Sequence, residues 1–201
     1  MEYHIQQHHT PEGIARKFHS ETQLAKFFDS NHVSYDRDWV NRLQFKTCQN
    51  IEGNCMSARP DFFLPEFSAK LKCVLLVGND EFAHRQYACE FQRVWNIAQA
   101  LEQTPEFRGV PIVYVRFNPH HFQINGKLEN VPLETAHQRL LGHLQTLSPA
   151  AIRPNVNLIY MQYDQKDGLL QVFADASDDT SSSLGSTDYR QVFASCLLDI
   201  W

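Results

Sequence analysis

Apolar residues recur at helical spacing near the start of the chain. Thr10 followed by Pro11 has the form of a helix N-cap and first helical position. The repeat ends at Ser30-Asn31, so we expect a helix from about Pro11 to Ser30. Its apolar positions are Ile14, Phe18, Leu24, Phe27 and Phe28. Looser alternation over residues 33–47 predicts a strand or hairpin, and a polar loop follows over 49–57.

The rest of the chain alternates between β-type runs and helical patterns. Two helices are expected over 81–103 and 132–147, and a loop is expected through Asn125-Gly126. The expected strands cover 60–67, 72–79, 111–117, 156–163 and 169–173. Strands separated by long helices predict an α/β fold with a mixed central sheet and helices on both faces.

Composition favours one packed domain with a tail. The chain has 201 residues, 43% of them apolar, including 14 phenylalanines. We expect a domain over 1–174, a flexible acidic linker rich in Ser and Asp over 175–188, and an apolar segment over 189–201 that docks on the domain or a partner. A polar start and the lack of an apolar run of about 20 residues predict a soluble protein without a secretory signal or membrane partner.

Cysteine content and charge bear on the compartment of the protein and on its attraction to phosphate. The five cysteines are odd in number and lack C-x-x-C spacing, which favours an intracellular, reducing compartment. Cys48 and Cys55 flank a loop and offer a zinc alternative, but no histidine pair lies at finger spacing. The net charge is −5, and residues 171–201 carry five acidic and one basic side chain. The nearly neutral remainder offers no strong general attraction to phosphate.

Two segments carry candidate metal chemistry. Arg59-Pro60-Asp61 precedes one expected strand, and the next expected strand leads into Asp80-Glu81. Neighbouring strands would bring these carboxylates to one point, as a hard cation such as Mg²⁺ requires.

These residues belong to a longer ordered set. It resembles the PD-(D/E)XK nuclease superfamily, in a branch frequent in large DNA viruses, algae and protists, and covers about residues 18–125. The set comprises Arg59-Pro60-Asp61, Asp80-Glu81 with His84 and Tyr87, Glu90 with Arg93, and Arg116-Phe117-Asn118-Pro119. The resemblance implies a restriction-endonuclease-like core with its active site where two central strands diverge.

The resemblance also implies roles for individual residues. Asp61 would bind Mg²⁺, and a water activated on the metal would attack a phosphodiester bond of DNA or RNA. Glu21 could be the acidic residue that the first helix contributes, while Arg93 and Arg116 contact phosphate or brace the carboxylates. His84 could take part in proton transfer.

Three departures from the family pattern weaken the expected activity. Gly78 replaces the second metal-binding glutamate, Ala83 replaces a glutamine and His120 replaces an aspartate. Asp80 projects from the same strand face as Gly78 and could substitute, but its side chain starts about 6–7 Å further along. An impaired metal site is therefore expected.

Each candidate also has a structural alternative. Asp61 could close a turn, and Asp80 and Glu81 could cap the following helix. His84 could simply pack or hydrogen-bond. Glu90 and Arg93 have the spacing of an intrahelical ion pair. The buried Arg116 needs a partner, which the acidic cluster could provide.

Three hypotheses follow. The leading one is a nuclease-fold protein with an impaired metal site that serves as a nucleic-acid-associated or structural component of a larger assembly. The competing one is an active Mg²⁺-dependent endonuclease that uses Asp61, Asp80 and Glu81. The third is a protein-interaction module in which the acidic tail and Trp201 bind a partner.

Overall fold

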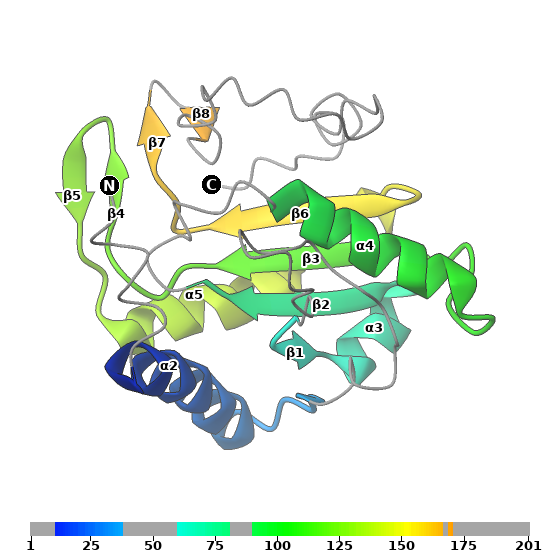
Figure 1. The fold of residues 1–201 in the computed structure, drawn as a ribbon, viewed down its shortest axis with the longest axis horizontal. Helices are drawn as coiled ribbons and strands as arrows, with labels where there is room; N and C mark the ends of the chain where they lie inside the picture. Colours follow the sequence, from blue (N-terminus) through cyan, green and yellow to red (C-terminus); the bar gives the residue numbers. More distant parts are fainter. Residues whose placement is uncertain (1–10, 38–59, 81–89, 167–168, 171–201) are drawn as a thin grey trace.

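A four-stranded mixed sheet forms the centre of the protein (Figure 1). The computed structural model describes residues 11–37, 60–80, 90–166 and 169–170. The strand order is β1-β2-β3-β6, with β1 antiparallel to β2 and the other three strands parallel. The bounds are β1 Phe62–Phe63, β2 Val74–Asn79, β3 Ile112–Phe117 and β6 Val156–Met161. These strands confirm the expected mixed α/β architecture.

Helices cover both faces of this sheet (Figure 1). Helices α2 (Pro11–Ser30) and α5 (Leu133–Thr146) pack on one face, and α4 (Glu90–Gln103) packs on the other. Phe28 of α2 and Leu140 of α5 belong to one apolar cluster, whereas Ile97 of α4 belongs to the second. The helices expected over 11–30 and 132–147 are confirmed, as is the described part of the helix expected over 81–103.

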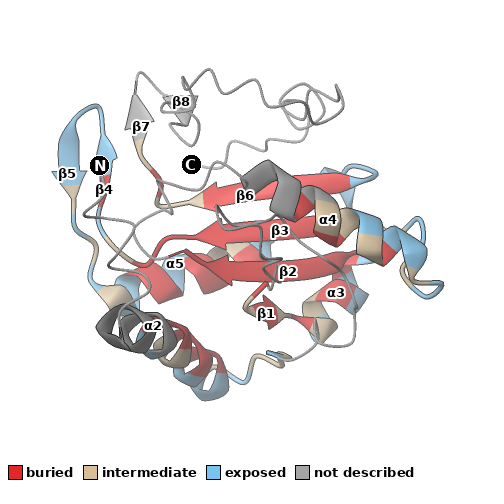
Figure 2. Ribbon diagram, in the orientation of Figure 1, coloured by how far each residue is buried: buried red, intermediate tan, exposed pale blue. Residues whose placement is uncertain are grey.

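Strand β2 alternates between the two clusters and is buried along its whole length (Figure 2). Leu75 and Val77 face α2 and α5, while Val74 and Leu76 face α4. Continuing this period of two places Gly78 on the α4 side, with the next residue, Asn79, on the α2 side. Consecutive residues at the end of β2 therefore lie on opposite sides of the sheet, one toward α2 and the next toward α4.

The prediction of one strand over 60–67 is wrong from residue 64 onward. Only Phe62–Phe63 is extended, and helix α3 follows over Pro65–Leu71. Pro65 at the helix start has the φ angle that the first helical position needs, and Glu66 suits the positive end of the helix. Lys72 closes α3 in the left-handed region at φ 55°.

A second, smaller sheet lies at one end of the molecule (Figure 1). Its order is β5-β4-β7-β8, with bounds β4 Phe122–Ile124, β5 Lys127–Glu129, β7 Gln165–Lys166 and β8 Leu169–Leu170. The expected loop through Asn125-Gly126 is instead the tight turn of the β4–β5 hairpin. Both turn residues have positive φ, 50° and 79°, as this kind of two-residue turn requires.

Several expectations lie outside the described residues. They are the strand or hairpin from 38 onward, the loop over 49–57, residues 81–89, the strand residues 171–173, the linker 175–188 and the segment 189–201. A short 3-10 helix, η3 (Pro149–Ala151), precedes β6. Within the part of the chain that is described, no helix has the length and apolar character needed to cross a bilayer.

Candidate functional site

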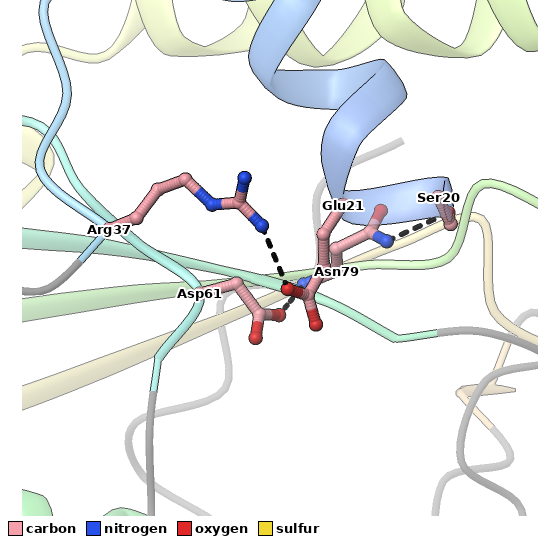
Figure 3. Close-up of polar contacts among 5 residues, drawn as sticks. All are labelled: Ser20, Glu21, Arg37, Asp61 and Asn79. Carbon is pink, nitrogen blue, oxygen red and sulfur yellow. Dashed lines mark hydrogen bonds and ion pairs between the residues drawn. The ribbon is translucent and has the colours of Figure 1, made fainter. Parts of the chain in front are cut away.

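Asp61 lies immediately before β1 and completes its pairing with β2. Its Oδ2 accepts a hydrogen bond from the backbone N–H of Asn79 at 2.7 Å (Figure 3). Phe62 pairs with Val77, so continuing the register places Asp61 across from Gly78. Asp61 therefore lies at the end of the sheet where β1 begins and β2 ends.

The side chain of Asn79 connects this edge to helix α2. Asn79 is 1% exposed, and its Nδ2 donates to Oγ of Ser20 at 2.8 Å (Figure 3). A buried amide that lost this acceptor would be left with an unsatisfied donor. The Ser20–Asn79 bond therefore fixes α2 against the end of β2.

Glu21 follows Ser20 on α2 and points toward the region of Asp61 (Figure 3). It is buried, and its carboxylate accepts from Arg37 at 3.2 Å. The Arg37 guanidinium also lies 5.7 Å from the ring centre of Phe62 in β1. The first helix thus brings an acidic residue toward the end of the sheet that carries Asp61.

The Asp80 carboxylate accepts hydrogen bonds from two buried residues, one in β3 and one just after β6. Arg116, from the end of β3, donates from Nε to Asp80 Oδ2, and Tyr163, which follows β6, donates its hydroxyl to the same oxygen. Asp80 is 2% exposed and Arg116 is 1% exposed. Asp80 of the acidic cluster is therefore the partner that the buried Arg116 was expected to need.

Burial and charge act together on the pKa values of this cluster. Burial alone would lower the pKa of Arg116, but the Asp80 carboxylate together with the Tyr163 and Tyr160 side chains outweighs burial and leaves that pKa raised. Burial, followed by the charge of Asp80, raises the pKa of Tyr163 well above its ordinary value. Burial also raises the pKa of the neighbouring Tyr160 to about 12. The cluster therefore consists of one ion pair and neutral phenols at physiological pH.

Tyr114 of β3 fills the space beside Gly78. A Cβ atom added at Gly78 would lie 2.9 Å from the Tyr114 hydroxyl oxygen and 3.2 Å from Cε2 of its ring. Tyr114 is 1% exposed, and the Arg116 guanidinium lies 5.2 Å from its ring centre. A larger side chain at position 78 therefore requires this buried ring to move.

The described residues do not supply the ligand set expected for Mg²⁺. Position 78 has no side chain, and Asp80 is held in the ion pair with Arg116. Across the ranges that the structure describes, no three His, Cys, Asp or Glu side chains gather as a metal site. The other proposed site residues, Glu81, His84 and the side chain of Arg93, lie outside the described residues, as do Cys48 and Cys55.

Sequence reasoning missed four residues that shape this edge: Ser20, Asn79, Tyr114 and Tyr163. The i, i+2 spacing of Tyr114 and Arg116 on one strand face was an available signal. The contact between Tyr163 and Asp80 joins positions 83 apart in the sequence, and no local pattern indicates it.

His120, which follows β3, is partly buried, and burial lowers its pKa.

Comparison of the chain with known proteins returned no match to a family model, to a curated protein or to a solved structure.

Proposed function

We propose that this chain is a nuclease-like protein of the PD-(D/E)XK kind with an impaired hydrolytic site. It would act as a nucleic-acid-associated or structural component of a larger assembly. One observation carries the proposal: Asp80 is held by Arg116 and Tyr163, while Tyr114 occupies the space beside Gly78.

The chemistry explains why this observation matters. Metal-assisted phosphodiester hydrolysis needs carboxylate oxygens that can bind the cation and leave room for water. A carboxylate that is buried against a guanidinium would have to break that ion pair before binding a cation. Breaking a buried pair is costly because the remaining charge stays away from water.

The architecture supports the ancestry. The sheet is mixed and flanked by helices, and Asp61 lies where β1 and β2 meet at one edge. Arg116 comes to the same edge from the neighbouring strand β3. This placement fits the restriction-endonuclease-like core that the ordered motifs imply.

A cleavage assay tests the loss of activity. Wild type, Asp61→Ala, and the double variant Gly78→Glu/Tyr114→Phe are incubated with single- and double-stranded DNA and RNA in Mg²⁺ or Mn²⁺. The second substitution removes the hydroxyl that would meet a new side chain at 78. We expect no cleavage by wild type and metal-dependent cleavage by the double variant.

Two controls make the result specific. Tyr114→Phe alone should stay inactive, and adding Asp61→Ala to the double variant should abolish any cleavage it gains. Wild-type cleavage that Asp61→Ala removes would instead establish the competing hypothesis of an active endonuclease. A salt-sensitive shift with DNA or RNA would support the nucleic-acid role over a purely structural one.

A further inference from the structure

The β4–β5 hairpin carries the exposed large apolar side chains of the described chain. Leu128 is 58% exposed and Ile124 is 36% exposed, and among the side chains whose burial the structure describes no other large apolar residue is so accessible. Figure 2 shows this hairpin as an exposed arm at one end of the molecule. Ile124 pairs with Lys127 and Leu128 pairs with Gln123, so these two apolar side chains lie on opposite faces of the hairpin, and Leu128 is the more exposed of the two.

The outer strand of this hairpin has an open edge. β5 is the terminal strand of its sheet and pairs only with β4 among the described strands. The two-residue turn makes Ile124 and Lys127 a hydrogen-bonded pair, so the next pair, Gln123 and Leu128, directs its backbone groups outward. The backbone N–H of Gln123 shows this outward direction, because it points away from β5 and donates to Oδ1 of Asp164 at 2.7 Å.

The outward backbone groups of Leu128 match those of a second β5 strand. If two copies align antiparallel with Leu128 opposite Leu128, each residue donates its N–H to the carbonyl oxygen of the other. Side chains directly opposite each other then lie on the same face of the joined sheet. The two exposed leucines would therefore cover each other.

The flanking charges are complementary in the same alignment. Lys127 and Glu129 lie on one strand face, and their charged atoms are 3.1 Å apart within the chain. In the antiparallel pair, Lys127 of each copy stands opposite Glu129 of the other. A lysine on an edge strand normally opposes pairing, but here the glutamate two residues later supplies its counter-charge.

From this register and charge pattern we propose that β5 is a self-pairing edge through which two copies of this chain associate. The resulting contact is isologous, with its two-fold axis at Leu128. Strand β5 has three residues, so the interface is small and the association is weak and concentration-dependent. The inference rests on the hairpin alone and does not depend on the state of the metal site.

Charge reversal at the two flanking positions tests the proposal. Sedimentation velocity is measured from micromolar to millimolar protein for wild type, Lys127→Glu, Glu129→Lys and the double swap Lys127→Glu/Glu129→Lys. Each single reversal places like charges opposite each other and should weaken self-association roughly tenfold or more. The double swap restores opposite charges and should associate like wild type.

Mixing the two single variants provides the sharpest readout. Lys127→Glu and Glu129→Lys are each weak alone but complementary to each other, so the mixture should associate. Unchanged thermal unfolding midpoints would show that the single variants remain folded. A wild-type chain that stays monomeric at millimolar concentration would overturn the proposal, as would self-association that the single reversals leave unchanged.

Discussion

Removing one partner of the buried Asp80–Arg116 ion pair should destabilise the protein strongly. Asp80 is 2% exposed and Arg116 is 1% exposed, so Arg116→Met leaves a carboxylate buried without its cationic partner. Such a change costs about 3–5 kcal/mol of unfolding free energy. For a chain of 201 residues, each 1 kcal/mol lowers the unfolding midpoint by about 2–4 °C, so we expect a fall of about 6–20 °C.

Urea unfolding followed by circular dichroism measures this loss. The double variant Asp80→Asn/Arg116→Met buries neither charge and should be more stable than Arg116→Met, because the two substitutions remove a coupled pair. Lys127→Met is a matched control: Lys127 is 81% exposed in its ion pair with Glu129, and its loss should change stability by less than about 0.5 kcal/mol. A loss below about 1 kcal/mol for Arg116→Met would refute the reasoning.

Three further predictions follow from packing and burial. Gly78→Ala should lower the free energy of unfolding, measured in urea, by about 1–3 kcal/mol, because the new Cβ meets the Tyr114 hydroxyl. If the same loss is found in a Tyr114→Phe background, the hydroxyl is not the cause. Phe62→Ala should cost about 3–5 kcal/mol, because Phe62 is fully buried and packs edge-on against Phe28 at 5.4 Å; a loss near that of a surface variant would contradict this packing. Burial lowers the pKa of His137 and His143 below 6.5 in the folded state, so the unfolded chain binds protons first as the pH falls. Stability should therefore decrease from about pH 7.5 to about pH 5.5, and an increase in urea unfolding free energy over that range would contradict this assignment.

The fold could be predicted where a pattern is long and consistent with one period. The helix over Leu133–Thr146 and the buried strand Ile112–Phe117 are of this kind. Short apolar runs were ambiguous, because Phe62, Phe63 and Phe67 suit a strand as well as a strand followed by a helix. The β4–β5 hairpin was missed because its strands have three residues each, too few to show alternation, although Asn125-Gly126 is a strong turn signal.

The candidate site could be predicted only in part from local sequence. Asp61 precedes β1 and Asp80 follows β2, and these strands are consecutive in the chain, so their placement at the same end of the sheet could be inferred. The role of Tyr114 depends on the parallel register of β2 with β3, where Leu76 pairs with Tyr114 and Gly78 pairs with Arg116. Strand order and register of this kind are tertiary properties that a single sequence does not state.

Manganese binding tests the central claim most directly. Mn²⁺ is titrated calorimetrically into wild type, Asp61→Ala and Gly78→Glu/Tyr114→Phe. Because Asp80 is held by Arg116 and position 78 lacks a carboxylate, we expect no stoichiometric binding by wild type and binding by the double variant. One tightly bound Mn²⁺ per wild-type chain that Asp61→Ala abolishes would contradict an impaired metal site.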